Sequence, residues 1–173
     1  FNYSTGETNI LSKIIKLRLQ EQNLDYLNFI SENLSSKIGL KNTIFEFDDS
    51  GTFIGGSSVF ANARDFARFG YLYLKDGQWD GETVVSKSWI DDTRKPAKNT
   101  HKMYSNKFWM PHPASPIPLL PKDTYFCAGF GGQYILIIPS KDMVLVRLGE
   151  TYMEDDKVLE NLSEIISFFE DII

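Results

Sequence analysis

Apolar residues recur at helical spacing along much of the chain, and this pattern predicts five helices. The first is favoured from Thr8 onward, with Ser4 or Thr5 available as its N-cap. Gly39 suits the end of the second helix, and Ser57 or Ser58 is the expected N-cap of the third. The predicted ranges are 8–19, 24–34, 61–74, 86–93 and 155–173. We expect the second helix to bury one apolar stripe and the last to cover a sheet.

Continuous apolar runs near the C-terminal end predict strands. Residues 134–138 and 143–148 read as an antiparallel hairpin joined by a turn at 139–142, and residues 125–128 as a third strand. Turn residues break 42–56 into short extended pieces, and the prolines between 111 and 121 predict an irregular loop. The predicted fold class is α+β, an antiparallel sheet covered by helices within a single domain over residues 1–173.

The charge and composition of the chain narrow the classes of partner. A formal net charge of -5 and no Lys/Arg cluster longer than a pair argue against binding to nucleic acid or an anionic membrane. No apolar run is long enough for an integral membrane segment, and the first residues do not form a signal peptide. The lone Cys127 says nothing about the redox compartment. Small molecules are therefore the expected partners.

Four separated segments resemble the beta-lactamase-like serine hydrolases. This family includes class C beta-lactamases, related esterases and aminohexanoate-oligomer hydrolases. The segments stand in the family's order and rough spacing, at 1–9 (Phe-Asn-Tyr-Ser-Thr-Gly), 55–81 (Gly-Gly-Ser-Ser, then Ala-Arg-Asp-Phe-Ala-Arg-Phe-Gly and Asp-Gly-Gln-Trp-Asp-Gly), 104–109 and 128–133. The resemblance implies a penicillin-binding-protein-like transpeptidase fold whose N-terminal part is missing from these residues.

The family's nucleophile is a serine in a Ser-x-x-Lys motif, and no serine of this chain has Lys three positions later. The chain begins without an initiator Met, so we expect the motif to lie upstream of Phe1. In the family, the tyrosine that matches Tyr3 relays a proton between nucleophile and leaving group. The alternative for Tyr3 is an ordinary tyrosine near a helix N-terminus.

The resemblance also assigns roles around the third predicted strand. Gly129 permits close backbone approach, and the N–H of Phe130 matches the strand's oxyanion donor. Gly131, Thr5 and Trp109 are the expected substrate contacts, Trp109 with Phe108 and Tyr104 as an apolar acyl site or, alternatively, as core.

Two departures from the family pattern bear on the substrate. Cys127-Ala128-Gly129 replaces the family's Lys-Thr-Gly or His-Thr-Gly, so both the cation and the hydroxyl are missing. Thr5 stands where class C beta-lactamases have Asn, and a hydroxyl cannot copy the paired donor and acceptor of an amide. Both changes steer the prediction away from beta-lactams and toward esters or amides.

The remaining polar residues suggest no further chemistry. His101 and His112 are not at ligand spacing, so neither a metal nor a cofactor is expected. Cys127 is expected to be an inert buried thiol, with no His or Asn motif to activate it. Arg64, Asp65 and Arg68 are expected to form a structural ion-pair cluster.

The sequence thus predicts a serine hydrolase of ester or amide bonds that works through an acyl-enzyme, with these residues inert alone. A catalytically inactive binding or regulatory module is the alternative, and a third possibility is an unrelated α+β domain that matches by chance. The family slightly favours the periplasm or secretion, and a cytoplasmic location stays open. Without the upstream part, surfaces that it covers would be exposed.

Overall fold

The computed structural model describes residues 3–111, 120–151 and 155–170. Its helices are α1 (Thr5–Glu21), α2 (Tyr26–Ile30), α3 (Ser36–Ile38), α4 (Ala63–Leu74), α5 (Lys87–Thr93) and α6 (Asp155–Glu170), with a π-helical turn η1 (Ser31–Ser35) and a 3-10 turn η2 (Pro139–Lys141). Its strands are β1 (Thr43–Phe45), β2 (Val59–Ala61), β3 (Gln78–Trp79), β4 (Glu82–Thr83), β5 (Tyr125–Gly129), β6 (Gln133–Ile138) and β7 (Met143–Arg147).

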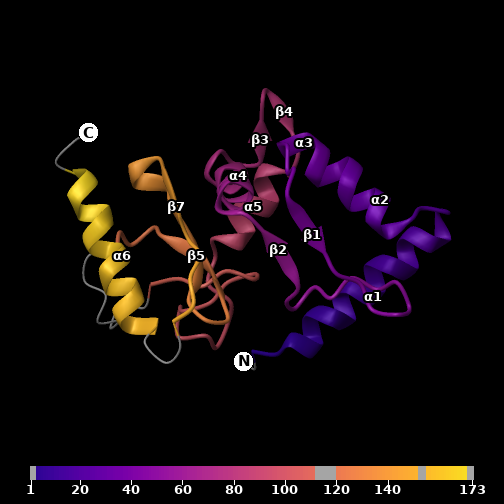
Figure 1. Cartoon of the computed structure of the whole chain (residues 1–173), viewed down its shortest axis with the longest axis horizontal. Helices are drawn as coiled ribbons and strands as arrows, with labels where there is room; N and C mark the ends of the chain where they lie inside the picture. The colour runs from indigo at the N-terminus through magenta and orange to yellow at the C-terminus, as the bar shows by residue number, and fades with distance from the viewer. Residues whose placement is uncertain (1–2, 112–119, 152–154, 171–173) are drawn as a thin grey trace.

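A three-stranded antiparallel sheet, ordered β5-β6-β7, lies between α6 on one face and α4 on the other (Figure 1). Leu136 and Ile138 of β6 pack with α6, while Ile135 and Ile137 pack with α4. Because side chains alternate between faces, a strand covered on both faces is apolar throughout. The predicted α+β class, the hairpin and the third strand are confirmed.

Gly70 allows α4 to lie close against the sheet. A Cβ at this position would lie 2.6 Å from Val144 Cγ1 and 3.0 Å from Ile135 Cγ2. Both methyl groups belong to the packed layer between α4 and the sheet, so they have little room to move. The sequence pattern of this helix does not single out the position.

We expect Gly70→Ala to lower the free energy of unfolding by about 1–3 kcal/mol, because overpacking outweighs the better helix propensity of Ala. Urea unfolding followed by circular dichroism measures the change. Gly6→Ala in the first turn of α1 is the matched control, since a Cβ there meets only Ser4 Oγ at 3.4 Å. A Gly70→Ala chain as stable as the control would contradict the close packing.

Helix α1 buries its polar side and exposes its apolar side. Ser12, Lys16 and Leu19 form the buried face, and Lys16 Nζ donates to the carbonyl of Ser50. The exposed side chains are large and apolar: Ile10, Leu11, Ile14, Ile15 and Leu17 are 63%, 48%, 49%, 44% and 48% exposed. Packing within the described chain therefore does not explain why this helix is apolar on that side.

Some predicted stripes are less buried than expected. Leu24 and Leu27 lie on the surface, 44% and 51% exposed, so the expected buried stripe of residues 24–34 is wrong at both. In α6 the side chains of Val158, Leu159, Leu162 and Ile166 pack on the sheet, whereas Ile165, Phe168 and Phe169 are exposed. The three described strands do not cover the whole apolar arc of α6.

The predicted helix caps are partly confirmed. Ser4 caps α1 and Gly39 ends α3 with φ 69°, as predicted, and Ser86, the first residue of the predicted range 86–93, is the N-cap of α5. The expected cap of α4 at Ser57 or Ser58 is wrong, because these serines precede β2, which pairs with β1. Asn62 is the N-cap, and its side chain accepts from Asp65 N at 2.8 Å.

The predicted proline loop lies mostly at 112–119, outside the described residues. Among the helices that the structure does describe, none has the length and apolar character needed to cross a membrane.

Candidate active site

Tyr3 lies in a cluster of aromatic rings just before α1. Its ring centroid is 5.2 Å from that of Trp109 and 5.4 Å from that of Tyr104, and the Tyr104 and Trp109 centroids are 5.0 Å apart. Contacts at these distances favour tilted and edge-on ring pairs, as seen here. The Tyr3 side chain is nonetheless 56% exposed, so its phenol can be reached by a ligand.

Trp109 connects this cluster to the sheet. Its backbone N–H donates to the carbonyl of Phe126 at 2.8 Å, and the backbone N–H of Phe126 donates to the carbonyl of Trp109 at 2.9 Å. Phe126 lies in β5, and Gly129 follows it by three residues, roughly 10 Å along an extended strand. The start of α1 therefore lies beside Trp109, which pairs with Phe126 near the start of β5.

The glycine turn after β5 is held by hydrogen bonds from neighbouring residues. Gly129 pairs with Gln133, and Gly131 and Gly132 have φ of 75° and 80°, which favour glycine. Thr151 N–H donates to the Gly131 carbonyl at 2.9 Å, and Arg147 donates to the Gly132 carbonyl. These hydrogen bonds hold the turn, and the Phe130 side chain at its tip is 87% exposed.

Gly55 and Gly56 allow a second close approach, to the first turns of α1. A Cβ on Gly56 would collide with the methyl group of Thr5, and one on Gly55 with the hydroxyl of Ser12. Asn9 Oδ1 accepts from Gly56 N at 3.3 Å. The Gly-Gly pair therefore holds the segment before β2 against Thr5, which is itself exposed at the start of α1.

The Cys127-Ala128-Gly129 segment places no cation on β5. Burial raises the pKa of the Cys127 thiol to about 12, so this group is neutral at physiological pH. Burial, with smaller contributions from the Tyr3 and Cys127 groups nearby, raises the pKa of Tyr104 to about 12. The Cys127 value agrees with the predicted lack of reactivity, although the side chain is half-buried and not buried as predicted.

Phe108 belongs to the core and not to the site. Its ring centroid is 4.8 Å from that of Tyr73 and 5.2 Å from that of Tyr125, between α4 and the sheet. Of the predicted acyl-site aromatics, only Trp109 and Tyr104 border Tyr3.

Lys107 is a site-neighbouring residue that the sequence did not reveal. Its Nζ donates to Thr8 Oγ1 at 2.9 Å, which ties the segment with Tyr104 and Trp109 to the first turns of α1. Lys107 has φ 76°, a conformation that non-glycine residues adopt only where surrounding contacts hold it. A lone Lys between Asn and Phe carries no pattern that could have indicated this contact.

The predicted ion-pair cluster of Arg64, Asp65 and Arg68 is not formed within the described chain. Asp65 Oδ2 instead accepts from Lys41 N at 2.9 Å, Asn42 N at 2.6 Å and Thr43 Oγ1 at 3.1 Å. Arg68 donates to the Ile38 carbonyl at 3.2 Å. The role of Asp65 and Arg68 is structural, as predicted, but it rests on hydrogen bonds to the segment before β1.

The described ranges contain no group of three or more His, Cys, Asp and Glu residues that could hold a metal ion. His101 is exposed, and His112 lies outside the described residues.

Comparison with known proteins identifies the fold. No protein-family model matches the chain, and no curated protein sequence matches it. A structure from Bacillus anthracis described as a 6-aminohexanoate-dimer hydrolase is similar, with a TM-score of 0.77 and 24% identity over 98% of this chain and 44% of its own. A beta-lactamase from Mycobacterium bovis has a TM-score of 0.70 and 16% identity, covering 95% and 62%. Simvastatin synthase from Aspergillus terreus has a TM-score of 0.66 and 14% identity over 93% of this chain and 53% of its own.

The chain therefore has the fold of beta-lactamase-like proteins, as the four sequence segments predict. It spans between 44% and 62% of the length of these neighbours. At these identities the likeness establishes the fold alone.

Proposed function

We propose that these residues form one part of a serine hydrolase that cleaves ester or amide bonds through an acyl-enzyme. The observation that carries the proposal is the contact between Tyr3 and Trp109, which joins the start of α1 to β5. A reachable phenol and a glycine turn at the end of a strand are what acyl transfer requires beside its nucleophile. The fold of the neighbouring structures supports the same reading.

Each group has a defined task in this proposal. The nucleophilic serine attacks the substrate carbonyl, and its proton passes by way of the Tyr3 phenol to the leaving group. The backbone N–H of Phe130, after Gly129, stabilises the negative charge on the tetrahedral intermediate. Trp109, Thr5 and Gly131 border the acyl group and orient it.

The nucleophile itself is supplied by polypeptide outside these 173 residues, upstream of Phe1. No Ser-x-x-Lys occurs in the chain, so the described residues alone would be inactive. The exposed apolar side of α1, directly after Tyr3, supports a covering polypeptide at this place.

The substrate is a small neutral ester or amide. The neutral Cys127 thiol on β5 offers no cation for a substrate carboxylate, and the Thr5 side chain offers no amide. Beta-lactams are therefore disfavoured, since their recognition depends on both groups in the family that this chain resembles.

Labelling with a fluorophosphonate tests the proposal, because an activated serine attacks its phosphorus, expels fluoride and becomes phosphonylated. We expect the longer protein with its upstream Ser-x-x-Lys to be labelled and the chain of residues 1–173 to stay unlabelled. A longer protein that has Ser-x-x-Lys and never labels would overturn the proposal.

An inactive binding or regulatory module is the second candidate, and the neutral Cys127-Ala128 pair favours it. Absence of Ser-x-x-Lys from the upstream gene sequence would decide for this alternative.

The exposed face of α1 leads to a separate prediction. In the chain of residues 1–173 we expect Ile14→Gln to change the free energy of unfolding by no more than about 0.5 kcal/mol. Leu19→Gln, on the buried face of the same helix, is the matched comparison and should cost about 2–5 kcal/mol. Urea unfolding of both variants measures this, and equal losses would mean that the apolar face is already packed.

A further inference from the structure

Residues 104–109 form a short hairpin that carries two of the rings beside Tyr3, and we call it the aromatic hairpin. Tyr104 pairs with Trp109 at its open end. Lys107 lies at its tip with φ 76°, a left-handed conformation that is strained for a residue with a side chain. The tip therefore has a backbone geometry that its surroundings must hold in place.

The base of the aromatic hairpin is anchored to the sheet and to α5. Trp109 exchanges two backbone hydrogen bonds with Phe126 of β5, and the Ser105 hydroxyl donates to the carbonyl of Thr93 in α5. Neither anchor reaches α1, which begins directly after Tyr3 and Ser4. How the rings of Tyr3 and Trp109 face each other therefore depends also on what joins the tip of the hairpin to α1.

Lys107 supplies such a connection. Its Nζ donates to Thr8 Oγ1 at 2.9 Å, and Thr8 follows Thr5 by about one helical turn. Thr8 is half-buried, and a Cβ on Gly55 would lie 3.4 Å from its methyl carbon. The acceptor is thus held by the segment before β2, although the Lys107 side chain is itself exposed.

The charge of Lys107 does not serve the stability of α1. The first turns of a helix carry a partial positive charge, so a cation beside them is disfavoured. The hydrogen-bond partner of Lys107 is a neutral hydroxyl, although Glu7 stands next to Thr8 in the sequence. The connection between the two segments explains this lysine better than helix electrostatics does.

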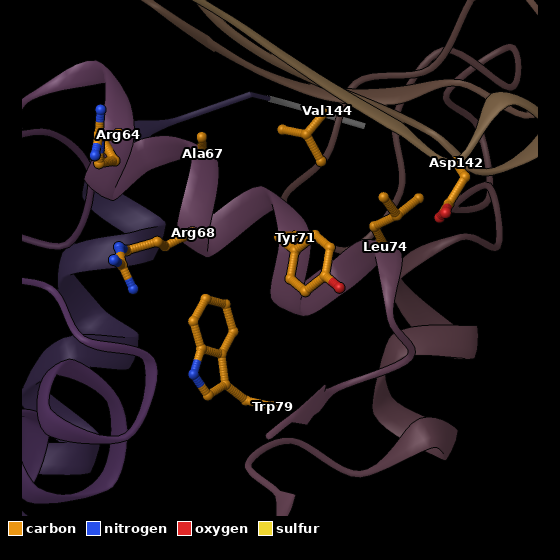
Figure 2. Close-up of a pocket in the computed structure, with 8 residues that line it drawn as sticks. All are labelled: Arg64, Ala67, Arg68, Tyr71, Leu74, Trp79, Asp142 and Val144. Carbon is orange, nitrogen blue, oxygen red and sulfur yellow. The ribbon is translucent and has the colours of Figure 1, made fainter. Parts of the chain in front are cut away.

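The candidate site is a surface where two segments meet. A hollow of about 470 Å³ lies elsewhere, over the outer side of α4, and Figure 2 shows Tyr71 and Trp79 among its lining residues. None of the residues that line it belongs to the candidate site. The shape of the surface beside Tyr3 depends on how α1 and the aromatic hairpin are held together.

We propose that Lys107 is a positioning residue for acyl transfer, because its hydrogen bond to Thr8 holds the aromatic hairpin against α1 and so holds the Tyr3 phenol beside Trp109. The inference rests on the proposed function, in which Tyr3 moves the proton. Proton transfer needs the phenol within hydrogen-bond reach of the reacting oxygens. A small displacement of the hairpin therefore slows the chemical step more than it weakens substrate binding.

Hydrolysis of a p-nitrophenyl ester by the longer protein that carries the nucleophile tests this role. Lys107→Met removes the donor, Thr8→Val removes the acceptor and keeps the methyl group, and Lys107→Arg keeps a donor. Lys102→Met is the matched control, since Lys102 is also exposed and also has a positive φ, of 64°. Fluorine NMR of protein labelled with fluorotryptophan reports the surroundings of Trp109, whose signal is assigned with Trp109→Phe.

We expect Lys107→Met and Thr8→Val each to lower kcat by about five- to tenfold, the loss of one hydrogen bond to a charged group, with KM changed by less than about twofold. The double variant should be no slower than Lys107→Met, because both changes remove the same bond. Lys107→Arg should keep most of the wild-type kcat, and Lys102→Met all of it. The Trp109 signal should shift in Lys107→Met and Thr8→Val and stay in place in Lys102→Met.

A wild-type kcat together with an unshifted Trp109 signal in Lys107→Met would overturn the inference and leave the proposed function standing. A raised KM with an unchanged kcat would also overturn it, since Lys107 would then contribute to binding and not to position. A wild-type longer protein that hydrolyses no ester would overturn the proposed function and, with it, this role of Lys107.

Discussion

Exchanging Tyr3 for Phe is expected to lower kcat for ester hydrolysis by about 10²- to 10⁴-fold in the form of the protein that carries the nucleophile. The substitution removes the phenolic hydroxyl, which in the proposed mechanism moves the proton. It keeps the ring that packs at 5.2 Å from Trp109 and 5.4 Å from Tyr104, so the surface beside β5 is retained. KM should therefore change much less than kcat.

Hydrolysis of a p-nitrophenyl ester measures both constants, and Tyr3→Leu separates chemistry from packing. If the hydroxyl carries the role, Phe and Leu should lower kcat to a similar extent. If the ring matters only for packing against Trp109, the Phe variant should keep the wild-type kcat and the Leu variant should lose activity. That second result would remove Tyr3 from the mechanism and return it to the ordinary tyrosine that the sequence alone also allowed.

The sheet could be predicted from sequence because its information is local. The apolar runs of β6 and β7 lie next to one another in the chain, joined by the Pro139-Ser140-Lys141-Asp142 turn. Asp142 adopts the left-handed conformation at φ 46°, which an aspartate in a turn tolerates better than most residues. The covering helices follow from periodicity alone. These elements therefore needed no knowledge of distant contacts.

The orientation of α1 could not be predicted in the same way. Its sequence has apolar residues on one broad side and Ser12, Lys16 and Leu19 on the other, and periodicity favours burial of the apolar side. The structure packs the other side, because Gly55 and the Ser50 carbonyl meet Ser12 and Lys16 there. Which side of the helix is covered depends on residues far away in the sequence that pack against it, and a local pattern does not contain them.

The candidate site also has some features that the sequence predicts and others that only the folded chain reveals. Tyr3, Trp109 and Gly129 could be predicted as site residues because motifs in a known order mark them, even though they lie far apart in sequence. The contact from Lys107 to Thr8 spans 99 positions and follows no motif, so only the folded chain reveals it. The anchoring carboxylate of Asp65 was assigned to the wrong partners for a similar reason, since its neighbours in the helix are arginines but its hydrogen bonds reach back to 41–43.

Asp65 is the carboxylate on which the junction between α4 and β1 depends. The residue is 3% exposed, and Oδ2 alone accepts from Lys41 N, Asn42 N and Thr43 Oγ1. Asp65→Ala would leave these donors without their acceptor, so we expect the free energy of unfolding to fall by about 2–4 kcal/mol. Asp65→Asn keeps an oxygen but loses the charge, so the free energy of unfolding should fall by about half as much. Asp92→Ala, in an exposed pair with Lys95, is the control and should change little.

The pH dependence of the destabilisation by Asp65→Asn shows whether the charge of Asp65 is its cause. Burial raises the pKa of Asp65, but hydrogen bonds from Asn42, Thr43 and Lys41 outweigh it, and the net pKa lies below the ordinary value of 3.8. A carboxyl whose pKa is lowered by folding stabilises the folded state above its unfolded pKa, and this contribution is lost as the pH falls through the folded value. Urea unfolding should therefore show the full difference between wild type and Asp65→Asn at pH 7 and a smaller one below about pH 4. A difference that is constant down to about pH 2 would mean that shape, and not charge, holds residues 41–43 against α4.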